Sequence, residues 1–485
     1  MHSSYKWAFG AVVLSACYSA PVFHEPVVDV VPTRAVSARS DARQASAASS
    51  PTAGMRSQQS AVMTTGAGFW RTIGDTTLTA LIAEALRASP TTQGAEARLA
   101  GARASRRLSA FDLVPSVTAT GSTLRSRQSV AQIPGLTNQL PHQDLYDVGF
   151  DANWELDIFG RVRRNVSAQG ALVASAEHSL DDVQVSLSAE VARTYFELRG
   201  AERQLSVARR NAENQARTVS LTQDRLAAGR GTAFDTERAR SVLQLTLAGV
   251  PSIESQIAAS THRLATLIGR TADALPKSVY AAADLPPLPD TVNVGSPKDL
   301  IRKRPDVLAA ERQVAANSLL VGAAQADYMP RLTLGASAGY TSTRFQSLTD
   351  PGMSRLVIGP VVSLPLLDVG RVRQRVDIAS ARQNESEVQY TATVLQAVEE
   401  AETALVSYDR AHARVVILTD AVRSSGRAAA LAQQRFEAGL TDFFQVLDAQ
   451  RTQLEAETQL ATAHTAAATA LVAVYKSVGG AWPAP

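Results

Sequence analysis

Polar and apolar residues alternate strictly along one stretch of the chain, residues 146–157. Apolar residues occupy every even position from Tyr146 to Leu156, and polar residues or glycine occupy every odd position from Asp147 to Asp157. A period of two belongs to a β-strand that has one apolar and one polar face. The pattern therefore predicts a long amphipathic strand in a chain that otherwise reads mainly as alanine-rich helix.

Three further strands are predicted, at about 116–126, 331–342 and 355–367. Two of them follow Pro115 and Pro330, and proline both ends a helix and favours extended backbone in the residue before it. Helices are predicted ahead of these prolines, at about 77–113 and 297–328. Strands of about ten to twelve residues have the length that a tilted strand needs to cross a bilayer.

Two very long helices are predicted from apolar residues that recur every three or four positions. They begin near Gly160 and Gly370 and end at Gly229 and Gly439. About 65 residues of helix span roughly 100 Å, so each helix must pack along similar helices in a coiled-coil-like layer. Shorter return helices are predicted at about 233–269 and 443–477.

The chain repeats itself, which predicts two halves of one architecture. Gly160-Arg-Val-Arg163 recurs as Gly370-Arg-Val-Arg373, and Arg225-Leu-Ala-Ala-Gly229 recurs as Arg435-Phe-Glu-Ala-Gly439, both 210 residues later. Upstream of the strands the offset becomes 215. The predicted structural repeats are residues 69–290 and 291–485.

The N-terminus has the features of a secretory signal, in which Lys6 precedes an apolar run too short to span a bilayer. Leu14-Ser-Ala-Cys17 resembles a bacterial lipobox, whose cysteine becomes the acylated first residue of the mature chain. We predict a signal peptide at residues 1–16, and a lipidated N-terminus with a flexible tether at 17–68. The alternative is a leader cysteine without a function. Tyr18, in place of Asp, permits sorting to the outer membrane by resemblance to other lipoproteins.

No other stretch contains 18 consecutive apolar residues, so no transmembrane helix is predicted, and a membrane crossing would require strands. Four strands cannot close a barrel, because bacterial barrels need at least about eight. An open sheet in lipid would leave backbone groups at its edges unpaired. Several copies of the chain must therefore share one barrel. The pattern itself leaves dimer, trimer and tetramer open.

Composition and charge exclude several classes of function. The net charge is +3, from 48 basic and 45 acidic residues that are interspersed, so nothing indicates a nucleic-acid partner. The seven histidines lack metal-ligand spacing, and the chain has no phosphate-binding loop or nucleophile motif. We therefore expect no enzyme activity, no metal and no cofactor apart from the lipid on Cys17.

A set of motifs runs from residue 17 to the end of the chain. They are Cys17, Phe69-Trp70, Ile73-Gly-Asp75, Leu78, Leu81-Ile82, Ala85-Leu86, Pro90, Trp154-Glu-Leu-Asp-Ile-Phe-Gly160, Leu364-Pro-Leu-Leu-Asp-Val-Gly370, Arg435-Phe-Glu-Ala-Gly439 and Val446-Leu-Asp-Ala-Gln450. Together they resemble the outer-membrane factors of the TolC superfamily, in the OprM/NodT lipoprotein branch of tripartite RND-type efflux systems. The tether is longer than this resemblance leads us to expect.

The resemblance implies a mainly α fold with β-strands, assembled as a homotrimeric TolC-like duct. A 12-stranded outer-membrane β-barrel, with four strands from each chain, would stand on a long periplasmic α-helical barrel. The implied function is passive conduction of drugs or other small toxic compounds, with a periplasmic adaptor and an inner-membrane RND-type transporter as partners. A type I secretion duct is the alternative, and a structural helical lipoprotein fits less well because it has no use for four strands.

The turns at Gly229 and Gly439 lie, by helix geometry, at the end of the tube farthest from the membrane. The resemblance implies that the adaptor docks at this tip, which includes Arg225 and Arg435. It also implies a periplasmic gate, for which the matching positions are Asp448 and Phe444. These two residues are four apart and so share a helical face. The competing interpretation is that Asp448 is a solvated charge near a helix N-terminus, where its sign suits the helix dipole.

Four arginines follow the strands at the starts of the long helices, where a cation is disfavoured by the helix dipole. They are Arg161, Arg163, Arg371 and Arg373. One explanation is contact between their guanidinium groups and the phosphates of outer-membrane lipid headgroups. The other is exposed arginine without a specific partner.

Overall fold

The computed structural model describes residues 63–64, 67–127, 129, 141–281, 283–289, 302–480 and 482–483. The predicted signal peptide, Cys17 and nearly all of the predicted tether lie outside these residues. The described chain forms two compact units, each built from segments that are distant in sequence. The strand unit contains the described residues of 104–172 and 313–387, and the helical unit contains those of 63–103, 173–312 and 388–483.

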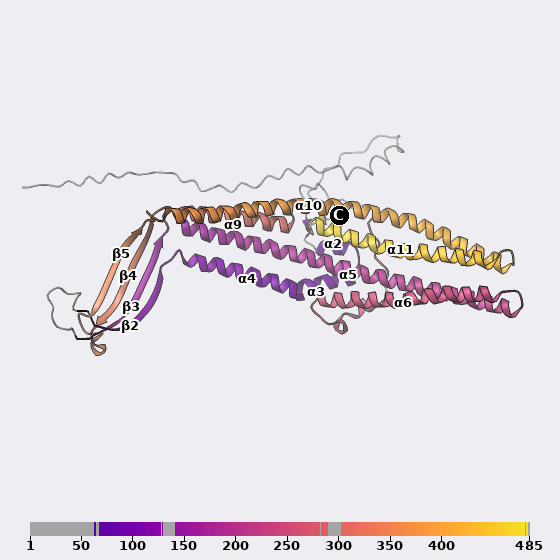
Figure 1. Ribbon diagram of the computed structural model, residues 1–485, viewed down its shortest axis with the longest axis horizontal. Helices are drawn as coiled ribbons and strands as arrows, with labels where there is room; N and C mark the ends of the chain where they lie inside the picture. The colour runs from indigo at the N-terminus through magenta and orange to yellow at the C-terminus, as the bar shows by residue number, and fades with distance from the viewer. Residues whose placement is uncertain are drawn as a thin grey trace, which may run out of the picture. The chain divides into compact units, whose positions relative to one another are not determined.

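Four antiparallel strands form the sheet of the strand unit, in the order β2-β3-β4-β5 (Figure 1). They are β2 (Ser116–Ser126), β3 (Gln143–Leu156), β4 (Arg331–Ser342) and β5 (Ser354–Ser363). The prediction of four strands is confirmed. β5 is shorter than predicted and ends at Ser363, because Pro365 lacks the N–H that a ladder requires and restricts the backbone of Leu364.

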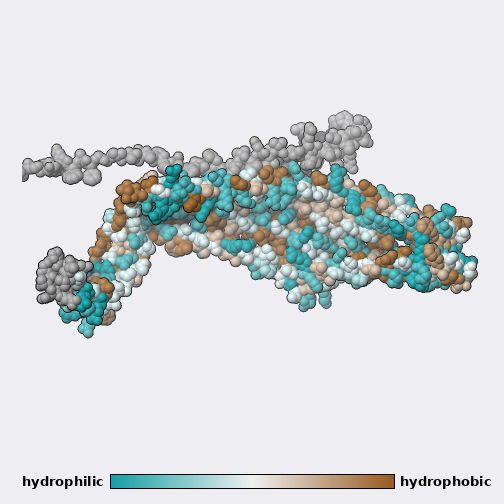
Figure 2. Space-filling model, viewed as in Figure 1, coloured by the Kyte–Doolittle hydropathy of each residue, from teal (hydrophilic) through white to brown (hydrophobic). Residues whose placement is uncertain are grey.

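The sheet has one apolar and one polar face, as the alternating pattern predicts. On the apolar face, Phe150 of β3 is 62% exposed in the single chain. Figure 2 shows apolar residues along β5, where Leu356 and Ile358 are also exposed. On the polar face, Arg355 of β5 reaches across β4 and donates to the two carboxylate oxygens of Asp147 at 2.9 and 2.7 Å.

The rest of the described chain is mainly helical, and the same order of elements occurs twice: α4-β2-β3-α5-α6 and α9-β4-β5-α10-α11. α5 and α10 contain 67 and 69 residues, which corresponds to about 100 Å of helix each. Of the described helices, none combines the length and hydropathy needed to cross a membrane. The helices are α2 (Ala67–Thr72), α3 (Thr76–Ala88), α4 (Pro90–Phe111), α5 (Arg161–Ala227), α6 (Ala233–Leu267), α7 (Lys277–Tyr280), α9 (Pro305–Ala326), α10 (Val369–Glu437) and α11 (Phe443–Ser477).

The single helix predicted over 77–113 is wrong, because α3 and α4 divide that segment between them. Ser89 separates them and is extended, with ψ of 132°. The ring of Pro90 disfavours helical backbone in the residue before it, which ends α3. The same proline suits the first position of α4, where its missing N–H would have no helical partner.

The aromatic residues of the N-terminal motif lie in the core of the helical unit. Trp70 is fully buried, and its ring centroid lies 4.8 Å from that of Phe69 and 4.5 Å from that of Tyr475 on α11. Asp75 caps α3 and also accepts a hydrogen bond of 2.7 Å from the Tyr195 hydroxyl on α5. Burial raises the pKa of Tyr195 to about 12, so this hydroxyl keeps its proton. The motif thus joins the start of the fold to α5 and α11.

Candidate functional site

The turns that end the two long helices have the same backbone hydrogen bonds. Gly229 has φ of +69°, its N–H donates to the Leu226 carbonyl at 3.0 Å, and the next N–H donates to the Arg225 carbonyl at 2.9 Å. Gly439 has φ of +74°, and the corresponding bonds to Phe436 and Arg435 measure 3.0 and 2.9 Å. Glycine suits both positions because it adopts left-handed backbone without steric cost. The four predicted tip residues therefore lie in equivalent places.

Arg225 joins the first turn to the second. Its guanidinium donates to the carbonyl oxygen of Phe436 at 2.8 Å and to that of Glu437 at 3.3 Å. Its Cζ also lies 4.0 Å from the centre of the Phe436 ring. A cation is favoured at a helix C-terminus, where carbonyl groups lack helical partners. Arg225 therefore caps α10 from the neighbouring hairpin.

A small apolar cluster lies below the two turns. Phe436 and Phe443 are both buried, with ring centroids 5.3 Å apart. The other buried members are Val219, Ala239, Val446 and Leu447. A cavity of about 750 Å³ lies beside this cluster and is lined by residues of both turns, including Gly229 and Gly439. The tip therefore combines a packed base with an accessible cavity between the hairpins.

The predicted gate residues lie on one exposed face of α11. Phe444 is 54% exposed, and Asp448 is exposed one turn later. Asp442 is the N-cap of α11 and accepts from the N–H of Gln445 at 3.1 Å. Because this capping position is already occupied, Asp448 is not needed to cap the helix. In the described part of the chain, the Asp448 carboxylate has no ion-pair partner.

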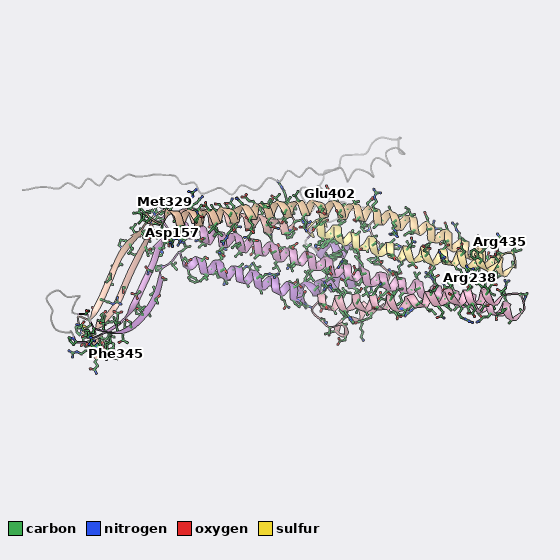
Figure 3. The ribbon with its side chains drawn as sticks, viewed as in Figure 1. Asp157, Arg238, Met329, Phe345, Glu402 and Arg435 are labelled. Carbon is green, nitrogen blue, oxygen red and sulfur yellow. The ribbon has the colours of Figure 1, made fainter. Side chains whose placement is uncertain are left out.

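Arg238, which no sequence motif singles out, is a neighbour of the predicted gate residue Phe444. Its guanidinium carbon lies 4.8 Å from the centre of the Phe444 ring. Figure 3 labels Arg238 near the start of α6. A cation over an aromatic face is attracted by the electrons of the ring. The repeat offset contained the signal, because Arg238 occupies the position 210 residues before Asp448.

The first strand-to-helix junction gives its arginines partners within the chain. Arg161 donates to the two carboxylate oxygens of Glu155 at 2.9 and 2.6 Å. The hydrogen bonds with Glu155 outweigh burial and raise the pKa of Arg161. Asp157 accepts from the backbone N–H of Arg163 at 2.8 Å and pairs with its side chain at 3.2 Å. These carboxylates explain why cations can occur at the N-terminus of α5.

At the second strand-to-helix junction, the arginine side chains are more exposed to solvent. Arg371 lies 3.7 Å from Asp368, and its side chain is 72% exposed. Arg373 is also exposed, and no ion pair involves it among the described residues. A cavity of about 260 Å³ at this junction is lined by Arg371 together with Arg331 and Arg375. Contact with lipid headgroups stays a prediction for these arginines.

Within the described residues, no group of three or more His, Cys, Asp or Glu side chains could hold a metal ion. The predicted lipidation residue, Cys17, lies outside them.

Comparison with known proteins identifies the family. The model of the family "Outer membrane efflux protein" matches residues 81–270 and 296–480. The outer membrane protein OprJ of Pseudomonas aeruginosa is 29% identical, over 98% of this chain and 97% of its own length. Nodulation protein T of Rhizobium leguminosarum bv. trifolii is 28% identical, over 81% of this chain and 84% of its own length.

A solved structure of the outer-membrane channel OprN matches the fold. It superposes with a TM-score of 0.81 and 35% identity, over 89% of this chain and 99% of the OprN chain. The resemblance to the TolC-like fold and to the OprM/NodT branch is confirmed by these matches. The chain belongs to the outer membrane efflux protein family and is a non-enzymatic efflux channel of the outer membrane.

Proposed function

We propose that three copies of this chain form the outer-membrane duct of a tripartite efflux pump. The duct conducts small compounds passively from the periplasm to the exterior. It receives them from an inner-membrane RND-type transporter through a periplasmic adaptor. A lipid on Cys17 adds a second attachment to the outer membrane.

The amphipathic four-stranded sheet is the observation that carries this proposal. β2 and β5 are its edges, and each pairs on one side only among the described strands. Unpaired edge groups cost several kcal/mol each in lipid, so strands there must meet partners. Edge pairing between copies satisfies these groups, with the face of Phe150 and Ile358 toward lipid and the Asp147–Arg355 pair toward the lumen. Three copies supply twelve strands.

The hairpin tip supplies the second part of the proposal. Phe444 and Asp448 are exposed in the single chain, as residues that line a shared axis must be. We assign them to the periplasmic gate, where rings narrow the pore and carboxylates surround it. The turns at Gly229 and Gly439, with the cavity between them, form the surface for the adaptor.

A strain that lacks the encoding gene tests this function. Expression of the wild-type chain should restore efflux of a fluorescent dye such as ethidium, measured as lower steady-state accumulation in intact cells. Purified protein should be trimeric by light scattering after correction for detergent, and should form channels in planar bilayers. Equal dye accumulation with and without the chain, together with a monodisperse monomer, would refute the proposal.

A further inference from the structure

Among the described residues, the contact made by Arg225 at one of the two equivalent tip turns has no counterpart at the other. The two turns share their backbone hydrogen bonds, and Arg435 occupies the position equivalent to Arg225. Arg225 is half-buried because it caps α10, whereas Arg435 is exposed. Figure 3 labels Arg435 close to the end of α10. One of two equivalent arginines thus lacks the acceptor that the other has within the described chain.

The acceptor side shows the complementary difference. Phe436 and Glu437 offer their carbonyls to Arg225, and the equivalent positions at the end of α5 are Leu226 and Ala227. Phe436 is 7% exposed beneath Arg225, whereas Leu226 is 39% exposed. Within the described residues the Leu226 carbonyl accepts only from the backbone N–H of Gly229, so the end of α5 lacks the side-chain cap that Arg225 supplies to α10.

On one chain, an exposed arginine and a helix end that lacks a side-chain donor are two different surfaces that fit one another, as the two sides of a head-to-tail interface must. When such an interface closes into a ring, the free donor of each copy meets the free acceptor of the next. We infer that Arg435 caps the end of α5 in a neighbouring copy of this chain. Its guanidinium donates to the carbonyls of Leu226 and Ala227 there, and its alkyl stem packs on the Leu226 side chain.

The inference rests on the proposed ring of identical chains. In that ring, arginine caps within a chain alternate with arginine caps between chains around the tip. At the contact between copies, Leu226 stands where Phe436 stands at the contact within a copy. Leu226 cannot make a cation–π contact with the arginine, but the two carbonyl acceptors are the same. The contact between copies should therefore be weaker than the contact within a copy, so the tip would separate first between chains.

Cross-linking of engineered thiols tests the contact. In a Cys17→Ser background, the only thiols of the full-length purified protein are those introduced. The pair Ala227→Cys with Arg435→Cys should react with a short bis-maleimide to give dimer and trimer bands on a denaturing gel. The matched pair Arg225→Cys with Glu437→Cys should give a cross-link within the monomer band. Each single variant should stay monomeric on the gel.

The oligomeric state, measured first by light scattering, separates the two hypotheses. A trimer in which the Ala227/Arg435 pair does not link copies, while the Arg225/Glu437 pair reacts, would overturn this contact and leave the proposed duct intact. A monomer would overturn both.

Thermal dissociation of the trimer gives a second readout that needs no cysteine. Arg435→Ala should lower by several degrees the temperature at which the trimer separates, and Arg435→Lys should restore part of it because the charge remains. Arg225→Ala should change that temperature less, since its acceptor lies in its own chain. Equal dissociation temperatures for wild type and Arg435→Ala would also count against the inference.

Discussion

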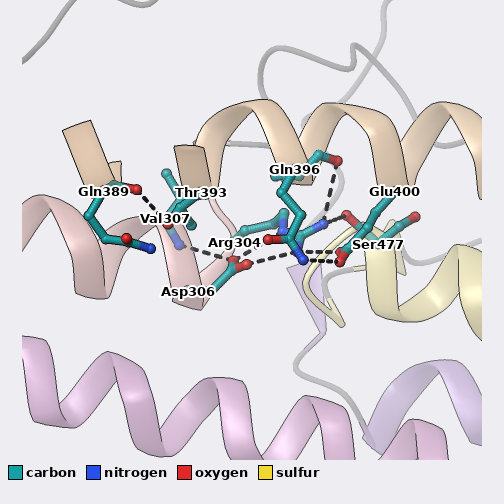
Figure 4. A network of polar contacts seen from close by, with 9 residues as sticks. Arg304, Asp306, Val307, Gln389, Thr393, Gln396, Glu400 and Ser477 are labelled. Atoms are coloured by element: carbon teal, nitrogen blue, oxygen red, sulfur yellow. Dashed lines mark hydrogen bonds and ion pairs between the residues drawn. The ribbon is translucent and has the colours of Figure 1, made fainter. Parts of the chain in front are cut away.

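Arg304 ties three helices of the helical unit together (Figure 4). It lies directly before α9, and its side chain is 6% exposed. Its guanidinium pairs with both carboxylate oxygens of Asp306 at 3.0 and 2.7 Å, and with Glu400 of α10 at 2.8 Å. It also donates to the Ser477 carbonyl at the end of α11, at 3.1 Å. We predict that Arg304→Met makes local opening easier where α9, α10 and α11 meet, although methionine keeps most of the side-chain volume.

The loss of free energy of opening in Arg304→Met depends on Asp306 and Glu400, the carboxylates that lose their partner. Removing one member of a buried ion pair costs about 3 to 5 kcal/mol, because the other charge stays desolvated. Asp306 and Glu400 are 27% and 35% exposed, so they keep part of their hydration and the lower end applies. A loss of about 3 kcal/mol corresponds to an opening equilibrium that is roughly 100-fold more favourable.

Amide hydrogen exchange measures this local opening directly. In the purified Arg304→Met protein, amides of residues 397–400 and 474–478 should exchange roughly 100-fold faster than in wild type. Arg423→Met is the matched control, since Arg423 pairs with Asp420 on α10 and both side chains are more than 60% exposed. It should change local exchange by a few-fold at most. Unchanged exchange in Arg304→Met would show that the packing of α9, α10 and α11 at this point does not depend on the Arg304 guanidinium.

Three further predictions concern the gate, a half-buried acid and the lipid. Replacing both Phe444 and Asp448 by alanine should raise planar-bilayer conductance several-fold in an intact trimer; wild-type conductance would move the gate to residues 229–235. Burial, reinforced by the charge of Asp306, raises the pKa of Asp182. Its neutral form is thus favoured in the fold, and stability falls as pH rises through the raised pKa. Asp182→Asn should therefore raise the melting temperature more at about pH 7 than at about pH 4, and a pH-independent difference would contradict this. Cys17→Ser should abolish incorporation of labelled palmitate, whereas label on the variant would exclude the lipobox interpretation.

The sequence predicted those parts of the fold that depend on local periodicity and on backbone-specific residues. Alternation of period two gave the strands and their two faces, because a strand exposes successive side chains to opposite sides. Gly229 and Gly439 marked the ends of the long helices because their left-handed backbone strongly favours glycine. The break at Ser89 was missed, although the Pro90 ring that causes it is visible in the sequence.

The partners of the site arginines could not be predicted in the same way. Arg225 donates to backbone carbonyls, and because every residue has a carbonyl, no side-chain pattern identifies the acceptor. The sequence predicts a lipid contact for Arg161, and the structure adds a partner that was not predicted, since its guanidinium is paired with Glu155, six residues earlier. A carboxylate so close in sequence was a usable signal, since a strand that turns back into a helix can bring the two side chains together.

The two hairpins of the tip have different side chains at positions that contact different residues. Both turns have glycine at the left-handed position, because the helix ends impose the same backbone geometry on each. At the position where the second hairpin has Asp448, the first has Arg238, and this arginine lies over Phe444 of the second hairpin. The first hairpin therefore positions the aromatic ring that we assign to the gate, while the second supplies the ring and the carboxylate. The two hairpins thus share the backbone of the tip, and different side chains at equivalent positions give them different contacts.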